Sequence, residues 1–358
     1  MWTELNRRDI VFEFALLGGI FRGKFMRLCN CALAVGAVAA LLSALGPANA
    51  APTYITVDAD SQPGTETHLA GVSDKGSAVG YFGSGPTGFI YRADGTIIVV
   101  NYAGLSALRG INKSGATTGA LAQGNRSLGG AGKPNGSIKA FSVFNKKNLV
   151  DTAAINEAGE IIGTYYSGAS ATHGFVRDSG GNITSFDATE FGTYPRAINA
   201  TGSITGYSHG HCFVRDPAGN LTTFDPTGQT NGTCQSINDN GTIVGTYTDN
   251  ADNVHSFLRS ARGTTTTFDA PGAGTSFGQG TFAVAINKKG VIVGYIYDSN
   301  FIAHGFVRSA AGNVTVFDMP VGDGVAQSTT PTSINTSGEI AGSYTDSSNL
   351  SHGFIRLP

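Results

Sequence analysis

Five histidines recur in matching surroundings, and histidine is the side chain best suited to proton transfer and metal binding near neutral pH. Each is followed two residues later by phenylalanine: His173, His211, His255, His304 and His352. An aspartate recurs with them, at Asp187, Asp225, Asp269 and Asp318. A catalytic or metal site needs such groups to converge on one point, whereas one histidine per repeated unit distributes them around a ring. The pattern therefore predicts structural His–Asp hydrogen bonds between strands.

Two other groups of residues could bind a metal ion. The run from Asp249 to Asn253 offers oxygen ligands of the kind calcium prefers, but its spacing matches no calcium motif and its composition is that of a turn. His209 lies two residues before His211, and we expect it to be a surface or turn residue. The sequence has no nucleophile elbow, phosphate-binding loop or zinc signature. We therefore predict no catalytic residue, no metal site and no cofactor.

These candidates belong to a unit of roughly forty residues that occurs seven times, and a repeat of this length sets the fold. Each copy begins with Asn, or Ser in the first copy: Ser73, Asn112, Asn156, Asn199, Asn238, Asn287 and Asn335. A turn glycine follows: Gly76, Gly115, Gly159, Gly202, Gly241, Gly290 and Gly338. A second glycine follows in the next strand: Gly80, Gly119, Gly163, Gly206, Gly245, Gly294 and Gly342. An aromatic residue marks the expected third strand: Phe89, Phe141, Phe175, Phe213, Phe257, Phe306 and Phe354.

The local chemistry of each copy favours β-structure. Asn-x-x-Gly is a tight-turn signal, and the strand after it alternates, as at Ile161, Gly163 and Tyr165. A glycine inside a strand marks the close approach of another backbone, which suits tightly stacked blades. The connection from Gln123 to Ser137 is expected to be the longest of its kind.

The fold class is therefore predicted to be all-β, a seven-bladed propeller with four antiparallel strands per blade. The last copy ends after its third strand, and Tyr54 to Asp58 resembles the missing fourth strand. An N-terminal strand that closes the last blade would remove the open sheet edges. The alternative is an open β-solenoid, but the sequence shows no capping units.

The repeated Ile-Asn-x-x-Gly-x-Ile-x-Gly-x-Tyr followed by His-Gly-Phe, best preserved from Ile155 to Phe175, resembles the bacterial extracellular HAF-repeat family. The resemblance covers residues 51–358 and recurs in register. The first two copies depart from the pattern, because Thr87 and Lys139 replace the histidine and Ser73 replaces the asparagine. The resemblance implies an exported repeat protein and supplies no catalytic residues.

The N-terminal region predicts export. Residues 26–50 have a short basic start, an apolar run and the small-residue pattern Ala48-Asn49-Ala50, which together are typical of a secretory signal peptide. Residues 1–25 are expected to be an upstream-start extension, and residues 51–358 the mature single domain. We expect a secreted or periplasmic protein with no membrane span after signal cleavage.

Charge and cysteine content agree with that location. The chain has 23 Lys and Arg against 25 Asp and Glu, a net charge of −2, and no basic patch, so nucleic acid is not an expected partner. Two of the four cysteines, Cys212 and Cys234, lie in the mature part. An oxidising compartment permits a disulfide between them, although sequence alone does not show that their Cα atoms approach closely enough.

The candidate binding residues lie in the connections whose length varies from copy to copy, because the functional residues of a repeat protein are usually in such loops. In an antiparallel blade the two variable connections emerge on one face. The expected ligand-binding residues of that face are Phe191, Tyr194, Gln229, Asn231, Phe277, Gln279 and Asp323. Packing of these residues within their loops is the alternative.

The sequence favours a binding or interaction module whose partner is a protein, a glycan or a component of the cell envelope. One alternative is a propeller enzyme, such as a lyase, a lactonase or a glycan-acting hydrolase, with its site at the channel mouth. Another is a structural cell-surface protein. Charged side chains that converge on the axis would favour the enzyme, whereas a broad polar and aromatic face would favour binding.

Overall fold

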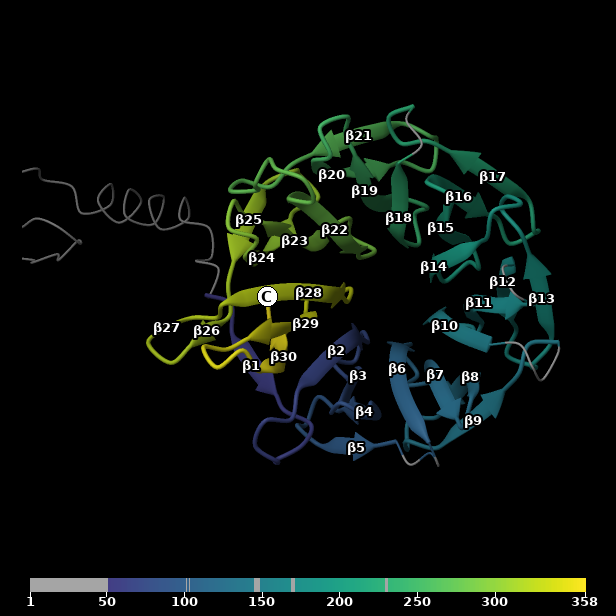
Figure 1. Ribbon diagram of the computed structural model, residues 1–358, viewed down its shortest axis with the longest axis horizontal. Helices are drawn as coiled ribbons and strands as arrows, with labels where there is room; N and C mark the ends of the chain where they lie inside the picture. Colours follow the sequence, from purple (N-terminus) through teal and green to yellow (C-terminus); the bar gives the residue numbers. More distant parts are fainter. Residues whose placement is uncertain (1–50, 101, 103, 145–148, 169–170, 229–230) are drawn as a thin grey trace, which may run out of the picture. The chain divides into compact units, whose positions relative to one another are not determined.

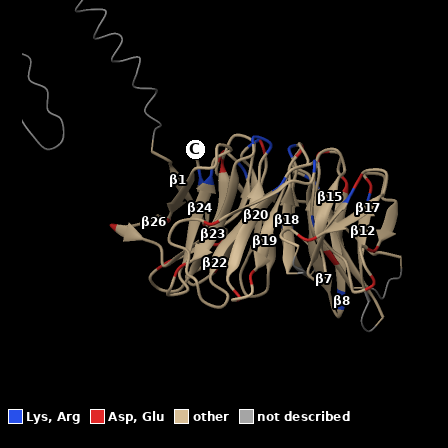
Figure 2. Cartoon of the chain, turned by 90° about the horizontal axis from the view of Figure 1, so that it is seen from above, with Lys and Arg blue, Asp and Glu red and all other residues tan. Residues whose placement is uncertain are grey.

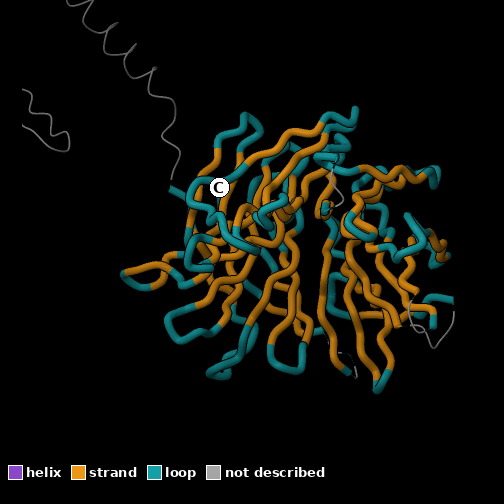
Figure 3. The backbone as a smooth tube through the Cα atoms, turned by 45° about the horizontal axis from the view of Figure 1, so that its top comes forward, coloured by secondary structure: helices purple, strands orange, loops and turns teal. Residues whose placement is uncertain are grey.

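The computed structural model describes residues 51–100, 102, 104–144, 149–168, 171–228 and 231–358. The chain divides into two units, Met1–Ala51 and Pro52–Pro358. The expected extension 1–25 and signal peptide 26–50 lie outside the described residues. The second unit is a ring of seven four-stranded antiparallel blades (Figure 1), which confirms the predicted fold class. Its described part consists of strands and loops without a helix (Figure 3).

Each blade presents its first strand to the centre of the ring and runs outward from there (Figure 1). The innermost strands are β2 (Thr67–Val72), β6 (Leu105–Ile111), β10 (Leu149–Ile155), β14 (Tyr194–Ile198), β18 (Gly232–Ile237), β22 (Gly280–Ile286) and β28 (Ser328–Ile334). The second strands are β3 (Ala78–Phe82), β7 (Thr117–Gln123), β11 (Ile161–Ser167), β15 (Ile204–Ser208), β19 (Ile243–Thr248), β23 (Ile292–Tyr297) and β29 (Ile340–Thr345).

The outer half of each blade follows the same order. The third strands are β4 (Thr87–Tyr91), β8 (Arg126–Gly132), β12 (Ala171–Arg177), β16 (His211–Arg215), β20 (Val254–Arg259), β24 (Ala303–Arg308) and β30 (Ser351–Arg356). The outermost strands are β5 (Ile97–Val99), β9 (Ile138–Phe141), β13 (Ile183–Phe186), β17 (Leu221–Phe224), β21 (Thr265–Phe268), β25 (Val314–Phe317) and β1 (Tyr54–Val57). A small hairpin, β26 (Pro320–Val321) with β27 (Gly324–Val325), precedes the last blade.

The N-terminal strand closes the ring. β1 pairs antiparallel with β30, from Tyr54 opposite Arg356 to Val57 opposite Gly353. The last blade therefore has the order β1-β30-β29-β28. The first and last segments of the propeller share one sheet, and the outer edge strand comes from the opposite end of the chain.

A β-bulge interrupts the innermost strand of every blade, and its position is the same each time. The pairing register shifts around the residue that lies three positions before the repeated Asn or Ser. These bulged residues are Ala70, Arg109, Ala153, Arg196, Gln235, Val284 and Thr332. A bulge redirects a side chain and leaves it outside the regular ladder.

The second repeated glycine is the counterpart of that bulge. A Cβ on Gly163 would lie 2.1 Å from the carbonyl oxygen of Asp151, and one on Gly206 would lie 2.1 Å from that of Tyr194. The other five glycines meet the equivalent carbonyl at 1.9–2.4 Å. The close backbone approach inferred from sequence is therefore real, but the approaching strand belongs to the same blade and not to its neighbour.

Neighbouring blades pack through the repeated phenylalanines, six of which are fully buried on third strands: Phe89, Phe175, Phe213, Phe257, Phe306 and Phe354. An outer-strand phenylalanine of one blade lies against the third-strand phenylalanine of the next, as in Phe186–Phe213 and Phe317–Phe354, with ring centroids 6.0 and 6.4 Å apart. An arginine of the next blade covers the same outer ring, for example Arg215 over Phe186. Apolar burial and cation–π contact thus join successive blades.

The second blade departs from the expected register. Phe141 belongs to its outermost strand β9 and packs edge-on against Phe175, as the outer-strand phenylalanines do elsewhere. The third strand is β8, within the segment expected to be a long connection, and Gly130 takes the phenylalanine position opposite Gly119. Lys139 therefore does not replace the histidine; Leu128, opposite Leu121, does. The prediction was wrong because a glycine-rich strand without its aromatic residue resembles a loop.

The asparagine side chains of the Asn-x-x-Gly turns link neighbouring blades by hydrogen bonds. Each donates from Nδ2 to the backbone carbonyl oxygen of the equivalent residue in the next blade, and Asn335 donates to Ser73 at 2.9 Å, across the closure. The other five links are Asn112 to Asn156, Asn156 to Asn199, Asn199 to Asn238, Asn238 to Asn287 and Asn287 to Asn335, at 3.0–3.2 Å. Ser73 has no amide group, so the ring of links is interrupted between the first and second blades.

Replacement of Gly163 by alanine is expected to destabilise the propeller by about 1–3 kcal/mol, because the new methyl group meets two backbone atoms, Asp151 O at 2.1 Å and Thr152 Cα at 2.8 Å. Urea unfolding measures the change. Gly180→Ala is the matched control, because Gly180 is exposed and its Cβ would meet only the Asp178 and Asn182 side chains, at 3.3 Å or more. Equal unfolding midpoints for the two variants would contradict the proposed role of Gly163.

Replacement of Ser73 by asparagine is expected to stabilise the propeller by about 0.5–1.5 kcal/mol, the net value of one hydrogen bond. Ser73 Oγ already accepts from the Ser77 N–H, as the asparagine oxygens do in other blades, so only the missing amide link is added. Thermal unfolding should show a higher Tm for Ser73→Asn and a lower one for Ser73→Ala. An unchanged or lower Tm for Ser73→Asn would show that the ring of links does not support the fold.

Candidate functional site

The repeated histidines lie on third strands and bind aspartates at the ends of outer strands. Nδ1 of His173 lies 2.8 Å from Asp187 Oδ1, and Nδ1 of His211 lies 2.8 Å from Asp225 Oδ1. His255 and His304 bind Asp269 and Asp318 in the same way, at 2.9 Å. His352 binds Asp58, which follows the closing strand β1, at 2.7 Å. Every one of these pairs joins two strands of one blade.

The last three of these histidines also face a second carboxylate, from the hairpin that precedes the third strand. Nε2 of His255 lies 3.3 Å from Asp249 Oδ2, and that of His352 lies 3.4 Å from Asp346 Oδ2. Nε2 of His304 lies 3.7 Å from Asp298 Oδ2. His173 instead meets the hydroxyl of Ser167 at 2.7 Å. These hydrogen bonds hold neighbouring strands of a blade together. Within the described residues no cluster of three or more His, Cys, Asp or Glu is arranged to hold a metal ion.

The acidic run from Asp249 to Asn253 is a turn whose carboxylate is already engaged. Asp249 Oδ1 accepts from the backbone N–H groups of Ala251 and Asn253, at 2.8 and 2.9 Å. The bond from Asn253 and the contact with His255 lower the pKa of Asp249 to about 2. His209 has a φ of 49° in its turn, and its ring lies 4.8 Å from that of Phe191.

The two cysteines of the propeller are joined. Cys212 of β16 and Cys234 of β18 form a disulfide with Cα atoms 5.4 Å apart. Both residues are fully buried, and the bond links the third strand of one blade to the innermost strand of the next. It therefore reinforces a blade interface and is not exposed for redox chemistry.

The expected ligand-binding residues do not form one site. Connections between second and third strands, and from outer strands to the next blade, emerge on one face, which we call the loop face; the Asn turns and the turns between third and fourth strands form the turn face. Asn231 and Phe277 line a shared groove of about 500 Å³, and Phe277 is 76% exposed. Asp323 lies at the tip of the β26–β27 hairpin, and Gln229 lies outside the described residues.

Three of the expected residues have neighbours that decide their roles. Gln279 is 2% exposed, and its Oε1 accepts from the Ser276 N–H at 3.0 Å, so it supports its loop and does not reach a ligand. Phe191 is exposed beside His209. Tyr194 alone among the six described residues of this set lies in the central channel, with its ring stacked on Tyr207 at 5.2 Å.

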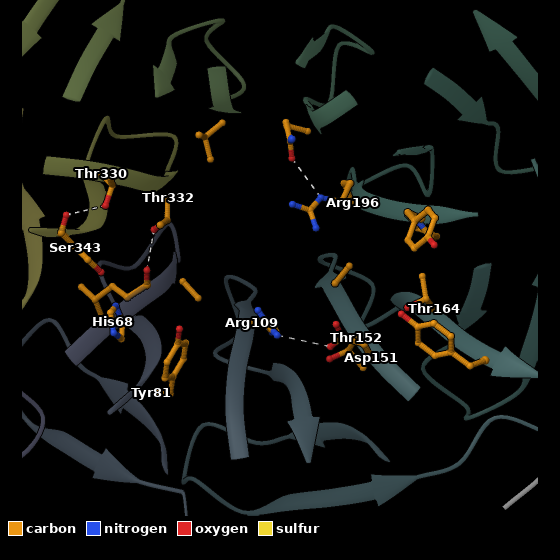
Figure 4. Close-up of a pocket in the computed structure, with 18 residues that line it drawn as sticks. His68, Tyr81, Arg109, Asp151, Thr152, Thr164, Arg196, Thr330, Thr332 and Ser343 are labelled. Carbon is orange, nitrogen blue, oxygen red and sulfur yellow. Dashed lines mark hydrogen bonds and ion pairs between the residues drawn. The ribbon is translucent and has the colours of Figure 1, made fainter. Parts of the chain in front are cut away.

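The main cavity of the propeller lies in the central channel and has a volume of about 510 Å³. All seven innermost strands contribute to it, and every bulged residue is on its wall: Ala70, Arg109, Ala153, Arg196, Gln235, Val284 and Thr332. Figure 4 labels Arg109, Arg196 and Thr332 among them. In four blades the residue two positions before the bulged residue also lines the cavity: His68, Asp151, Tyr194 and Thr330. Four residues of second strands complete this part of the wall: Tyr81, Thr164, Tyr166 and Ser343. The Asn turns border a separate cavity of about 200 Å³ at the turn face.

Charge within the cavity is unevenly paired. Arg109 and Arg196 both reach toward the open centre (Figure 4), and Asp151 is the one carboxylate among the described lining residues. Arg109 Nη2 lies 3.9 Å from Asp151 Oδ1, and both side chains are about half exposed, so the pair is weak. Arg196 Nε donates instead to the neutral Oε1 of Gln235 at 3.2 Å.

Aromatic rings form the wall next to Arg196. Tyr166, near the end of strand β11, is 40% exposed, and Tyr194 is beside it in the next blade. Burial first, and then the nearby Tyr194 and Asp151, raise the pKa of the Tyr166 phenol, so its hydroxyl remains a hydrogen-bond donor at neutral pH. Across the cavity the His68 ring lies 5.1 Å from Tyr81, and His68 Nε2 lies 3.7 Å from Glu66 Oε2.

Comparison with protein-family models and with curated proteins finds no match. Comparison with solved structures finds β-propellers. Virginiamycin B lyase from Staphylococcus aureus is 13% identical, with a TM-score of 0.59, and the match covers 86% of this chain and 100% of that one. The β-propeller domain of the trilobed protease from Pyrococcus furiosus is 10% identical, with a TM-score of 0.56 over 81% of this chain and 95% of that domain. These similarities show the propeller fold.

Stability that depends on pH is expected at His255. Burial of the ring lowers its pKa, but the hydrogen bonds that its N–H groups donate to the Asp269 and Asp249 carboxylates outweigh burial and raise the pKa above 6.5. The folded state therefore favours the imidazolium, and the stabilisation is fully present below about pH 6.5 and is lost as pH rises through the raised pKa. Thermal unfolding from about pH 6 to 8 should show the Tm advantage of wild type over His255→Gln shrinking as pH rises.

The Tyr247 ring, whose centroid lies 5.2 Å from that of His255, is present in both wild type and His255→Gln. A double variant, Asp249→Asn with Asp269→Asn, removes both carboxylates, and its Tm should be less sensitive to pH over the same interval. A Tm difference between wild type and His255→Gln that stays constant, or grows with pH, would contradict the assignment.

Proposed function

We propose that this chain is an exported β-propeller binding module that holds a small polar ligand, or a polar end of a larger one, in its central channel. The observation that carries the proposal is the contrast between two sets of repeated positions. The framework positions hold Asn or Ser and two glycines in all seven blades, whereas the bulged positions hold Ala, Arg, Ala, Arg, Gln, Val and Thr. The fold thus repeats its supports and varies the side chains that share one cavity.

The size and chemistry of the cavity suit a binding site. Its volume of about 510 Å³ lies within the usual range for small-molecule sites, about 300–1,000 Å³. Hydroxyl, amide, guanidinium and phenol groups converge there on a rigid strand scaffold. Strands hold such groups more firmly than loops do, which favours the channel over the groove at Phe277.

Export is supported by two independent features. The pattern of residues 26–50 is that of a secretory signal peptide, and the buried Cys212–Cys234 disulfide belongs to an oxidising compartment. A secreted or periplasmic location and the HAF-repeat resemblance are consistent with each other. In such a location, saccharides and other cell-envelope components are among the candidate ligands.

An enzyme that uses His68 is the second candidate. Its imidazole lies in the cavity, with Tyr81 beside it and Glu66 behind it, and a histidine so placed can act as a general acid or base. The lyase among the similar folds makes a lyase reaction the first to assay. Turnover of any saccharide or lactone by the wild type that His68→Gln abolishes would favour this function over simple binding.

Tyr166→Ala is expected to weaken ligand binding at least tenfold, about 1.4 kcal/mol, because it removes an exposed ring from the cavity wall. The measurement is binding of the mature protein to an array of bacterial and plant polysaccharides, followed by calorimetry on the best ligand. Phe277→Ala is the control, since that ring is more exposed but lies in the outer groove. If Phe277→Ala abolishes binding and Tyr166→Ala does not, the ligand binds at the loops.

A further inference from the structure

The two arginines of the central cavity have a combined positive charge that the nearby carboxylate only partly neutralises. Arg109 and Arg196 face one carboxylate, Asp151, among the described lining residues. Asp151 Oδ1 lies 3.9 Å from Arg109 Nη2, beyond hydrogen-bond distance. Within the described residues no hydrogen bond or ion pair joins Asp151 to Arg196. A cavity with this balance attracts an anion, because a recess lined by an excess of one sign of charge concentrates ions of the opposite sign.

Arg196 is held in place by an uncharged partner. Gln235 Oε1 accepts from Nε at 3.2 Å, and both residues are bulged positions of adjacent blades. The two terminal nitrogen atoms of Arg196 have no hydrogen-bond partner among the described residues. A guanidinium fixed through Nε presents its terminal N–H groups to a ligand, and a carboxylate matches the geometry of the guanidinium.

The surfaces around Arg196 are those that a sugar ring requires. Tyr166 and Tyr194 lie on the same side of the cavity, where an aromatic face can cover the apolar C–H groups of a pyranose. Thr330, Thr332 and Ser343 stand on the opposite wall (Figure 4). Thr330 and Thr332 donate their hydroxyl protons to backbone carbonyls, at 2.9–3.1 Å, so their oxygens face the cavity as acceptors for ligand hydroxyl groups.

We propose that the ligand of the channel is an acidic saccharide, a sugar ring whose carboxylate pairs with Arg196 and is drawn in by Arg109. The inference rests on the proposed binding function and adds the class of ligand. Asp151 sets the direction of the ligand, since it repels the carboxylate from the wall formed by the third blade and accepts hydroxyl groups there. Thr330, Thr332 and Ser343 of the seventh blade, which carry no charge, then face the edge of the sugar that lacks the carboxylate.

A matched pair of probes tests the assignment: trigalacturonic acid, and the same trisaccharide with its carboxyl groups methyl-esterified. Calorimetry on the mature protein should show the acid binding at least tenfold more tightly than the neutral ester. The affinity for the acid should fall as salt rises from about 50 to 300 mM, because salt screens the attraction. Equal affinity for acid and ester overturns the inference.

Variants separate the role of Arg196 from general effects of charge. Arg196→Gln should reduce affinity for the acid at least tenfold, reduce affinity for the ester much less and keep the wild-type Tm. Arg196→Lys should recover only part of the loss, because lysine lacks the guanidinium fork. Arg262→Gln is the matched control, since Arg262 is exposed in a turn between third and fourth strands, at the turn face. Undiminished affinity of Arg196→Gln for the acid overturns the inference.

Two further outcomes distinguish this inference from the proposed function. Binding of an acidic tripeptide as tightly as the trisaccharide overturns the saccharide class. Binding of other array polysaccharides that depends on Tyr166 but not on Arg196 overturns the acidic class and leaves the binding function in place. Absence of any Tyr166-dependent binding across the array overturns both.

Discussion

One backbone contact shapes every blade: a carbonyl oxygen of the innermost strand occupies the space where a side chain would begin on the second strand. Only glycine leaves that space free, and the seven glycines from Gly80 to Gly342 supply it. The contact goes with the bulge in the innermost strand, and the bulge turns one side chain per blade into the channel. Without the glycine, the strands would separate or the bulge would straighten, and the cavity wall would lose its defined shape.

The structure separates the repeated supporting residues from the variable residues that line the channel. Asn links hold the blades at the turn face, phenylalanine and arginine pack them further out, and His–Asp pairs lock strands toward the loop face. Lys and Arg gather mainly on the side that carries the C-terminus (Figure 2), which is the turn face because Pro358 lies beside Gly338. None of these repeated supports lies at a bulged position, although some bulged residues also form hydrogen bonds between blades, Arg196 to Gln235 and Thr332 to the carbonyl oxygen of Leu69.

The fold could be predicted from sequence because its supports repeat. The spacing of Asn and Gly predicted seven units. Residues 54–58 resemble an outer strand, which predicted that the N-terminal strand closes the last blade. The second blade was assigned incorrectly, because Gly130 replaces the phenylalanine that marks a third strand. The channel residues other than Tyr194 were missed for a different reason. A bulge changes which face a residue occupies, and its place depends on a contact between strands, which simple alternation does not reveal. Counting three residues back from each Asn would have found Arg109, Arg196 and Gln235.

The closing strand has a consequence for the order in which the chain can fold. β1 must wait for β30, which lies almost at the other end of the propeller, and the pair Asp58–His352 joins residues 294 positions apart. Contacts of such large sequence separation form slowly, because the loop must close before they stabilise anything. A chain made from its N-terminus therefore keeps its first strand unpaired until β30 is available. Until then the first six blades must hold together through their own interfaces, with the Cys212–Cys234 bond between the fourth and fifth as a covalent reinforcement.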